Sequence, residues 1–275
     1  MVTFRFEEIT GHVRRVLGNG DVCMYLVEGD ERAALIDTAY GVGDLAGYVH
    51  GLIGDKPLDV ILTHGHIDHA SGAAQFDCCY MSSLDIPVYE ECCTIERRRE
   101  TITRRAFADL ADAVEGDYVP IDTSVMRPLS EGDVFDLGGI TVEMIAVPGH
   151  TPGMMVPLVV EEGIAIFGDA CGVGTLIMLD HSSTVERYRE SLLHLKKQEG
   201  RYNIVLRQHG TCVSTKRVLD DNLELCDYVL AGRDAAEPTE HNGIPCLRAA
   251  ATDPLTGHRL DGREGNLLYR KDRVR

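Results

Sequence analysis

The 275-residue sequence contains no tryptophan, and aromatic residues make up only 6% of it. This scarcity disfavours a carbohydrate-binding platform or a surface that stacks nucleic-acid bases. Basic residues are also few, because 27 lysines and arginines stand against 44 aspartates and glutamates, for a formal net charge of −17. A phosphate backbone is repelled at long range by such a chain. The composition therefore predicts no nucleic-acid partner.

Long apolar runs are lacking as well. No stretch approaches the ~18 uncharged apolar residues of a membrane span, so no membrane partner is expected. The N-terminal "MVTFRFEEIT" alternates apolar and polar residues and has early acids. It predicts a first strand rather than a signal peptide, and hence a cytoplasmic location. The nine cysteines include no CxxC motif and are expected to be reduced thiols.

The residues that are present indicate an α+β fold. A hydrophobic content of 44% suits a substantial core, and no repeat or Pro/Gly-rich linker divides the chain. We predict one domain over residues 1–275, with a helical insertion at about 85–125. Short strands, mostly antiparallel in character, are expected at residues 4–8, 22–28, 33–37, 60–63, 141–147, 154–160, 164–168, 204–208 and 266–270. Helices are expected at residues 90–115, 185–198 and 215–231, the second with Ser183 as its N-cap.

The stretch "LTHGHIDHASG" concentrates four side chains that can bind metals. His64, His66, Asp68 and His69 follow directly after the apolar strand at residues 60–63. Gly65 is expected to let the loop turn tightly between the first two histidines. A helix that begins near Asp68 would orient the other two residues. Alone, the motif favours a metal site over a polar surface turn only modestly.

Three further candidate ligands follow apolar strands downstream. "IAVPGHTPG" places His150 after a strand, "IAIFGDACG" places Asp169, and "IVLRQHGTC" places His209. Each residue taken singly has an ordinary alternative, since the histidines could lie in turns and the aspartate could cap a helix. Four sets of candidate ligands at strand ends in one chain predict a metal centre.

In this order of motifs the sequence resembles the metallo-β-lactamase superfamily. Asp37 in "ALIDTAY" matches an acid that precedes the HxHxDH motif, and the resemblance covers roughly residues 20–215. It implies a four-layer αββα sandwich with the site at the edge between the two sheets. It also implies that Asp37 holds the HxHxDH loop without being a ligand. The implied ligands are His64, His66 and His150 for one metal, Asp68, His69 and His209 for the other, and Asp169 as the bridge.

Imidazole and carboxylate ligands without cysteine suit two zinc ions, with iron or manganese as alternatives. Two such ions lower the pKa of a bridging water and make a hydroxide nucleophile available. We therefore predict a dinuclear hydrolase in which this hydroxide attacks a small ester, thioester or lactone carbonyl. The resemblance implies that Asp68 accepts and returns the proton. The ligand set is most similar to those of glyoxalase II-like hydrolases, lactonases and phosphodiesterases, although Met154, Met155 and Gln208 depart from the usual glyoxalase II motifs.

The segment "ERRRETITRR", residues 96–105, is the one strongly basic patch of the sequence. It is either a solvated helix face whose arginines pair with Glu96 and Glu100, or a lid that binds a carboxylate or phosphate. On the second interpretation the substrate-binding residues are Arg97, Arg98 and Arg104. The partner is then a small, anionic molecule. A phosphodiesterase or phosphatase, a non-catalytic metal-bound sensor and an iron redox centre stay as alternative functions. The oligomeric state is open, with a homodimer as one option.

Overall fold

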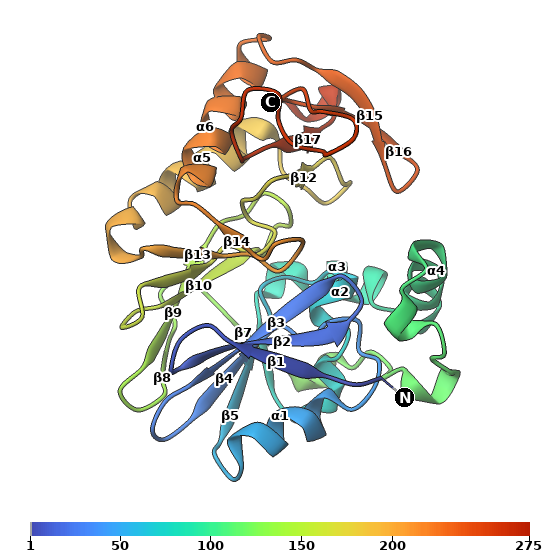
Figure 1. The fold of residues 1–275 in the computed structure, drawn as a ribbon, viewed down its shortest axis with the longest axis vertical. Coiled ribbons are helices and arrows are strands. Elements are labelled where there is room, and N and C mark those ends of the chain that lie inside the picture. Colours follow the sequence, from blue (N-terminus) through green and yellow to red (C-terminus); the bar gives the residue numbers. More distant parts are fainter. Residues whose placement is uncertain (1) are drawn as a thin grey trace.

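In the computed structural model, which describes residues 2–275, two β-sheets pack face to face (Figure 1). The first sheet has seven strands in chain order: β1 (Arg5–Glu8), β2 (Val13–Asn19), β3 (Val22–Glu28), β4 (Ala33–Ile36), β5 (Leu58–Ile61), β6 (Cys79–Met81) and β7 (Met126–Pro128). The second has six, in the order β14 (Val213–Ser214), β13 (Ile204–Leu206), β11 (Ile164–Ile166), β10 (Met155–Val159), β9 (Thr141–Ala146) and β8 (Val134–Asp136). The predicted strands agree with these bounds to within two residues, but β2, β6, β7, β8 and β14 were not predicted.

Half of the first sheet is parallel, although most strand pairs over the three sheets are antiparallel, as expected. Strands β1 to β4 pair antiparallel, whereas β4, β5, β6 and β7 pair parallel. Parallel neighbours need crossover connections, and helices supply them here. Helix α1 (Leu45–Ile53) connects β4 to β5, α2 (Ile67–Ala70) lies between β5 and β6, and the insertion lies between β6 and β7. Helices therefore cover the outer face of this sheet.

Alternation along the strands produces the layers. In β3, Tyr25 and Val27 face the core between the sheets, while Met24 and Leu26 face the helices of the first half. In β10, Met155 faces the same inter-sheet core. The opposite face of β10 packs with α5 (Val185–Lys196) and α6 (Arg217–Leu230). The order helix, sheet, sheet, helix confirms the predicted αββα sandwich.

The helix expected at residues 90–115 is interrupted, and this expectation was wrong. The chain forms α3 (Ile86–Cys92) and α4 (Ile95–Arg105), followed by short 3₁₀ turns. Thr94 starts α4 by accepting a hydrogen bond from the Arg97 amide. Ala106 ends the helix in the left-handed region, with φ of 50°. At α5 the cap is Thr184 instead of the expected Ser183, and it accepts from the Arg187 amide.

A third sheet lies at the C-terminal end of the sandwich and was largely missed. Its order is β12 (Thr175–Ile177), β17 (Leu267–Tyr269), β16 (Ile244–Arg248) and β15 (Glu237–His241). Only β17 was predicted, because prolines and charges mask the hydrophobic alternation of β15 and β16. Asn242 and Gly243 join these two strands with φ of 51° and 81°, as a tight hairpin turn requires. The hairpin extends toward α4 across the front of the molecule (Figure 1).

Two simpler expectations concern thiols and membranes. All nine cysteines are free thiols in the structure, as predicted. Among residues 2–275, no helix combines the length and apolarity that crossing a bilayer demands.

Candidate metal centre

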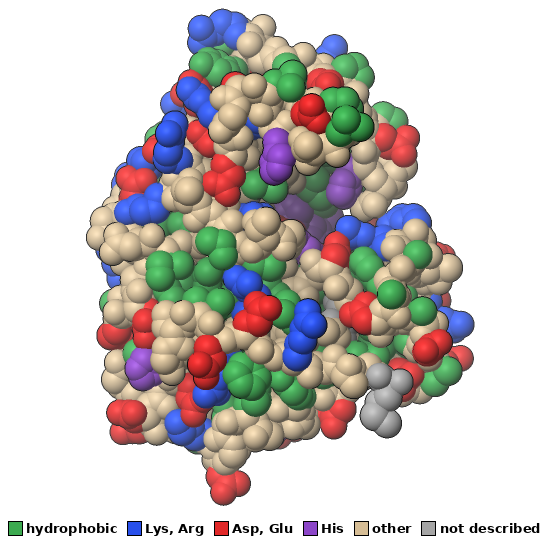
Figure 2. All heavy atoms as spheres, in the orientation of Figure 1, with side chains coloured by type: hydrophobic (Ala, Val, Ile, Leu, Met, Phe, Trp, Pro, Cys, Tyr) green, Lys and Arg blue, Asp and Glu red, His purple; other side chains and the backbone are tan. Residues whose placement is uncertain are grey.

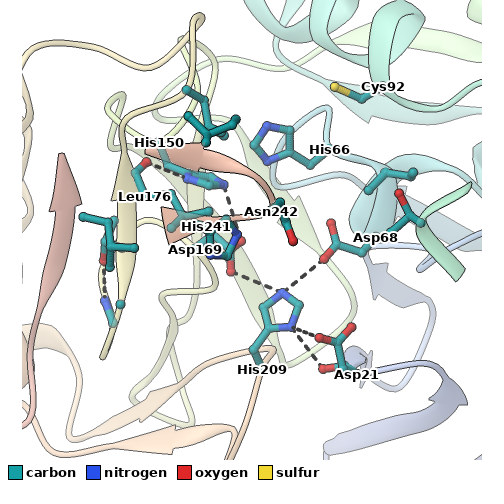
Figure 3. Close-up of a pocket in the computed structure, with 18 of the residues that line it drawn as sticks. Asp21, His66, Asp68, Cys92, His150, Asp169, Leu176, His209, His241 and Asn242 are labelled. Carbon is teal, nitrogen blue, oxygen red and sulfur yellow. Dashed lines mark hydrogen bonds and ion pairs between the residues drawn. The ribbon is translucent and has the colours of Figure 1, made fainter. Parts of the chain in front are cut away.

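Four loops bring all seven predicted metal ligands to one edge of the sandwich. His64 and His66 follow β5, His150 follows β9, Asp169 follows β11 and His209 follows β13. Asp68 and His69 lie on α2, the short helix expected at this position. Figure 3 shows five of these side chains, from separate segments, pointing toward one another: His66, Asp68, His150, Asp169 and His209.

The first cluster consists of three buried histidines. His64 Nε2 lies 3.1 Å from His66 Nδ1, and His150 completes a set whose ligand atoms all lie within 4.8 Å of one another. The imidazole rings of His66 and His150 meet edge to face with centroids 4.6 Å apart. We call this set the three-histidine pocket.

The second cluster mixes a carboxylate with two imidazoles. His69 Nε2 lies 3.3 Å from His209 Nε2, and His209 Nε2 lies 3.4 Å from Asp68 Oδ2. This set, which we call the mixed pocket, is the more open one. The side chains of Asp68 and His209 are 15% and 28% exposed, whereas that of His69 is fully buried.

Asp169 lies between the two pockets. Its Oδ2 is 3.4 Å from His150 Nε2 and 3.7 Å from His69 Nε2, and its Oδ1 is 3.6 Å from His209 Nε2 (Figure 3). Asp169 also forms a third possible metal-holding group with His64 and His69. The carboxylate therefore reaches both halves of the centre, as the sequence resemblance implied.

Backbone carbonyls orient two of the imidazoles. His150 Nδ1 donates to the Leu176 carbonyl at 3.0 Å, and His209 Nδ1 donates to the Asp21 carbonyl at 3.0 Å. Each hydrogen bond places the ring proton on the outer nitrogen and leaves the Nε2 lone pair directed into the cluster. His150 Nε2 is buried and has no hydrogen-bond partner in the described chain.

Asp37 orients the HxHxDH loop from beneath. Its carboxylate accepts from the Thr63 amide at 2.6 Å, from the Thr63 hydroxyl at 2.7 Å and from His69 Nδ1 at 2.8 Å. The Thr63 oxygen in turn accepts from His64 Nδ1 at 3.0 Å. Gln208, which the sequence marked as a departure, donates to the same carboxylate at 2.6 Å. Asp37 itself adopts an uncommon left-handed backbone, with φ of 66°.

His181 orients the remaining ligand and was given no role from the sequence. His66 Nε2 lies 2.7 Å from His181 Nε2, so that His66 donates outward and keeps its Nδ1 lone pair for the cluster. Burial and the nearby His150 lower the pKa of His181 to about 4, and a neutral imidazole can accept this bond. The two histidines are 115 residues apart in the chain, which is why no local pattern marks the pair.

Asp85 joins the loops of the three-histidine pocket and was also missed. This fully buried carboxylate accepts from the Gly65 amide at 2.9 Å, the Gly153 amide at 2.6 Å and the Thr151 hydroxyl at 2.6 Å. It thereby connects the loop of His64 and His66 to the loop of His150. Gly65 is required for this close approach, because a Cβ there would lie 2.6 Å from the Asp85 carbonyl oxygen. The chain bends at Gly65, and since its φ is not in the left-handed region, the close approach to Asp85 is what requires glycine there.

The protonation of the ligands differs between the pockets. Burial, with the neighbouring imidazoles, holds the pKa of His64 and His66 well below the usual value, so both are neutral. Burial also lowers the pKa of His69, but Asp68, Asp169 and Asp37 outweigh it and raise this pKa to about 10. For Asp169, burial raises the pKa, while the surrounding imidazoles of His209, His69 and His150 hold it well below its usual range.

The donor set fits two divalent cations. Zinc binds imidazole nitrogen at about 2.0–2.1 Å, so two nitrogens of one tetrahedral site lie about 3.3 Å apart. The separations of 3.1 Å for His64 and His66 and of 3.3 Å for His69 and His209 match this edge. His150 Nε2, which has no hydrogen-bond partner in the described structure and lies 3.4 Å from Asp169 Oδ2, is a further donor. The three-histidine pocket and the mixed pocket could each hold one ion.

A cavity of about 1130 Å³ opens above the ligands. Figure 2 shows histidine side chains at a hollow between the C-terminal sheet and the basic surface of α4. Arg97 and Arg104 line this cavity, as does Arg105, whose guanidinium pairs with Asp21 at 2.6 Å. From the hairpin side, His241 and Asn242 complete the wall (Figure 3).

Arg98 does not reach the cavity, which corrects its assignment as a substrate-binding residue. The side chain is fully buried and donates to the carbonyl oxygens of Tyr40, Gly41 and Val119. These contacts attach α4 to the loop after β4. Helical spacing turns Arg98 inward, whereas Arg97 and Arg104 are exposed.

Comparison with known proteins identifies the relatives of this arrangement. The sequence model described as the Metallo-beta-lactamase superfamily matches residues 17–209. The acyl-coenzyme A thioesterase MBLAC2 of Bos taurus is 27% identical over 190 residues, which are 61% of this chain and 67% of the bovine protein. The atrochrysone carboxyl ACP thioesterase dmxR1 of a Cryptosporiopsis species is 26% identical over 189 residues, 65% of this chain. This chain spans about half the length of the fungal relative, 49%.

Solved structures show the same fold at low identity. The metallo-beta-lactamase from Pontibacter korlensis superposes with a TM-score of 0.57 at 15% identity, covering 81% of this chain and 98% of that one. The sec-alkylsulfatase Pisa1 from a Pseudomonas species superposes with a TM-score of 0.61 at 16% identity, covering 84% of this chain and 42% of that one. At this identity the superpositions establish the architecture alone.

Proposed function

Because the chain belongs to the metallo-β-lactamase superfamily, we propose that it is a dinuclear metal-dependent hydrolase that cleaves a thioester. The observation that carries this proposal is the arrangement of the five histidines. Each has one ring nitrogen held by an outward hydrogen bond and the other directed into the cluster. Such preorganisation is what a metal centre requires, and a surface cluster of histidines has no use for it. The thioester is inferred from the names of the two relatives described above.

The proposed ligands are His64, His66 and His150 for one ion and Asp68, His69 and His209 for the other, with Asp169 between them. When bound, two divalent ions supply a water of lowered pKa as nucleophile and polarise the substrate carbonyl. Zinc suits this donor set best.

Asp68 is the residue that we propose to move the proton. Its carboxylate lines the cavity and is partly exposed, whereas the carboxylate of Asp37 is fully buried beneath the loop. A carboxylate beside the nucleophile can accept its proton and return it to the leaving thiolate. His241 and Asn242 also line the cavity, but neither joins a ligand cluster in the described residues.

The arginines of α4 are proposed to bind an anionic part of the substrate. Arg104 is exposed on the cavity wall and has no ion-pair partner among residues 2–275, and Arg97 pairs with Glu91 only at 3.5 Å on the surface. A guanidinium in this situation can bind a phosphate or carboxylate by paired hydrogen bonds. The phosphates of a coenzyme A or carrier-protein thioester have the required charge.

The test is hydrolysis of a panel of acyl thioesters, lactones and esters by protein whose metal content has been measured. We expect about two ions per chain, thioester cleavage as the fastest reaction, and loss of turnover in Asp68→Asn, whose metal content is measured alongside because Asp68 is also a proposed ligand. Arg104→Ala should raise KM for coenzyme A thioesters but not for short neutral thioesters. Arg99→Ala is the matched control, since this exposed arginine on the same helix lies outside the cavity wall. No turnover by fully metal-loaded protein on any acyl substrate would contradict the proposal.

A phosphodiesterase is the second candidate, and the same arginines favour it. Arg97 and Arg104 face the cavity, where they can bind a phosphodiester as well as a carrier phosphate. Faster cleavage of bis-(p-nitrophenyl) phosphate than of any thioester would select this alternative.

A further inference from the structure

The two faces of the C-terminal sheet have different surroundings. Paired residues of neighbouring strands project to the same face, so the pairs Leu176–Leu268 and Leu268–Arg248 define one face of β12, β17 and β16. The other face, with Ile177, Leu267 and Tyr269, packs into the core with α5 and α6. The first face, by contrast, lines the cavity above the metal ligands.

This cavity-facing side is more apolar than an exposed sheet surface needs to be. Leu176, Leu179 and Leu268 line the cavity together with Val173 and Ile244. Val173 and Ile244 are 48% and 37% exposed, which makes them two of the exposed large hydrophobic residues of the protein. A sheet with one buried face ordinarily presents polar residues on the other, as Arg248 does here beside the apolar residues. We call these five residues the apolar wall.

The apolar wall begins at the metal centre itself. The Leu176 carbonyl accepts the hydrogen bond from His150 Nδ1, so the backbone of β12 is one bond away from a proposed ligand (Figure 3). The wall then continues across β17 to Ile244 near the hairpin tip. A bound small molecule whose carbonyl group lies at the metal ligands can therefore extend an aliphatic chain outward along this sheet.

The opposite wall of the cavity has a different character. It is formed by α4, whose exposed Arg97 and Arg104 face the opening. A ligand with an aliphatic chain on one side of its reacting carbonyl and an anionic carrier on the other matches both walls in polarity and charge.

We propose that the apolar wall is the binding site for the aliphatic acyl chain of the substrate, and that it selects medium to long chains. This inference rests on the proposed thioesterase function for the identity of the carbonyl. Val173, Leu176 and Leu179 lie within the family match at residues 17–209, whereas Ile244 and Leu268 follow it. Acyl-chain selection is thus assigned to a surface that the family match and the C-terminal sheet form together.

The experiment measures binding of saturated carboxylates from acetate to dodecanoate to the metal-loaded protein by calorimetry. Carboxylates are product analogues, so the assay works whether or not thioesters are cleaved. Affinity should rise roughly two- to fourfold per added methylene until the wall is covered. Ile244→Ser and Val173→Ser should each reduce, several-fold, the gain in affinity of dodecanoate over acetate, and should leave the affinity for acetate unchanged. Leu255→Ser, at a residue 94% exposed and away from the cavity, is the control.

The outcomes separate the two proposals. Affinity that does not depend on chain length, or a dependence that both wall variants retain, would overturn the acyl site. Length-dependent binding that the wall variants lose, without cleavage of any acyl thioester, would support the acyl site and overturn the thioesterase. Because Val173 and Ile244 lie on separate, exposed segments, a folding defect in one variant does not affect the other. Matching melting temperatures for each variant and Leu255→Ser exclude unfolding as the cause.

Discussion

The three-histidine pocket and the mixed pocket are built on opposite electrostatic principles. His64 and His66 are buried among other imidazoles, and their lowered pKa keeps them neutral before any cation arrives. In the mixed pocket, carboxylates surround His69 and raise its pKa to about 10, so that a cation must displace a proton there. A cation is therefore stabilised by neutral lone pairs in one pocket and by negative charge in the other.

The two pockets also differ in what holds them. Asp37 holds His69 of the mixed pocket directly and reaches His64 only through Thr63, whereas Asp85 supports the three-histidine pocket through the Gly65 and Gly153 amides. The mixed pocket is the more exposed of the two, through Asp68 and His209. We propose from this comparison that the buried pocket would mainly position an ion, while the open pocket would meet the proton and the substrate.

Substitution of Asp169 should have the largest effect, since its carboxylate is common to both pockets. We expect Asp169→Asn to lose metal from both halves and to lose all detectable activity, because the bridging charge disappears. Elemental analysis after gel filtration and a thioester assay measure this. Asp180→Asn is the control, because Asp180 lines the cavity outside the ligand clusters. Retention of full metal content by Asp169→Asn would contradict the proposed bridge.

Removing one ligand from each pocket should separate the halves. His150→Ala should abolish binding in the three-histidine pocket and His209→Ala in the mixed pocket, each leaving the other pocket able to bind. Stepwise titration with a chromophoric chelator as competitor, together with cobalt absorption spectra, distinguishes the two. If either variant loses both ions together, the pockets are not independent and the comparison is wrong.

Smaller losses of metal affinity are expected when the carboxylates that hold the ligand loops in place are substituted. Asp37→Asn should weaken metal binding in the mixed pocket and Asp85→Asn in the three-histidine pocket, each by roughly 10- to 100-fold, because orienting hydrogen bonds are lost. Competition titration of each pocket is the measurement. Asp221→Asn is the control for a buried carboxylate remote from the site, where it accepts from the Glu264 and Gly265 amides. Equal weakening of both pockets by Asp37→Asn would contradict the assignment.

The smallest effect concerns the metal-free protein and its stability against pH. The raised pKa of His69 contributes stability that is complete below about pH 6.5, the unfolded value, and is lost as the pH rises through about 10. The lowered pKa of His64 and His66 does the reverse, with stability present above about pH 6.5 and lost as the pH falls below it. Urea denaturation of apoprotein across this range should show a maximum near neutral pH. His69→Gln should remove the alkaline loss and leave the acid loss, and a variant that keeps both would contradict this account.

Much of the fold follows from local patterns. Apolar runs bounded by turns predicted the strands, and the structure confirms them because alternate residues such as Tyr25 and Met24 occupy separate cores. The helix at residues 90–115 was wrong, since helical spacing alone cannot show that Thr94 begins a second helix. The β15–β16 hairpin was missed because Pro238 and Pro245 interrupt its pattern. The formation of such a hairpin depends on the neighbouring strand β17, with which β16 pairs.

The sequence by itself determined which side chains gather at the metal centre, because each of the seven follows a strand and the strand ends meet at one edge of the sandwich. Only the tertiary structure decided which nitrogen of each imidazole faces the centre. The outward hydrogen bonds of His66 and His209 go to residues 115 and 188 positions away in the chain. The tertiary structure also decided which residues line the cavity, because it turned Arg98 inward and added a C-terminal sheet that supplies an apolar wall. Ligand identity is encoded locally, whereas ring orientation and pocket shape arise from long-range contacts that no local pattern records.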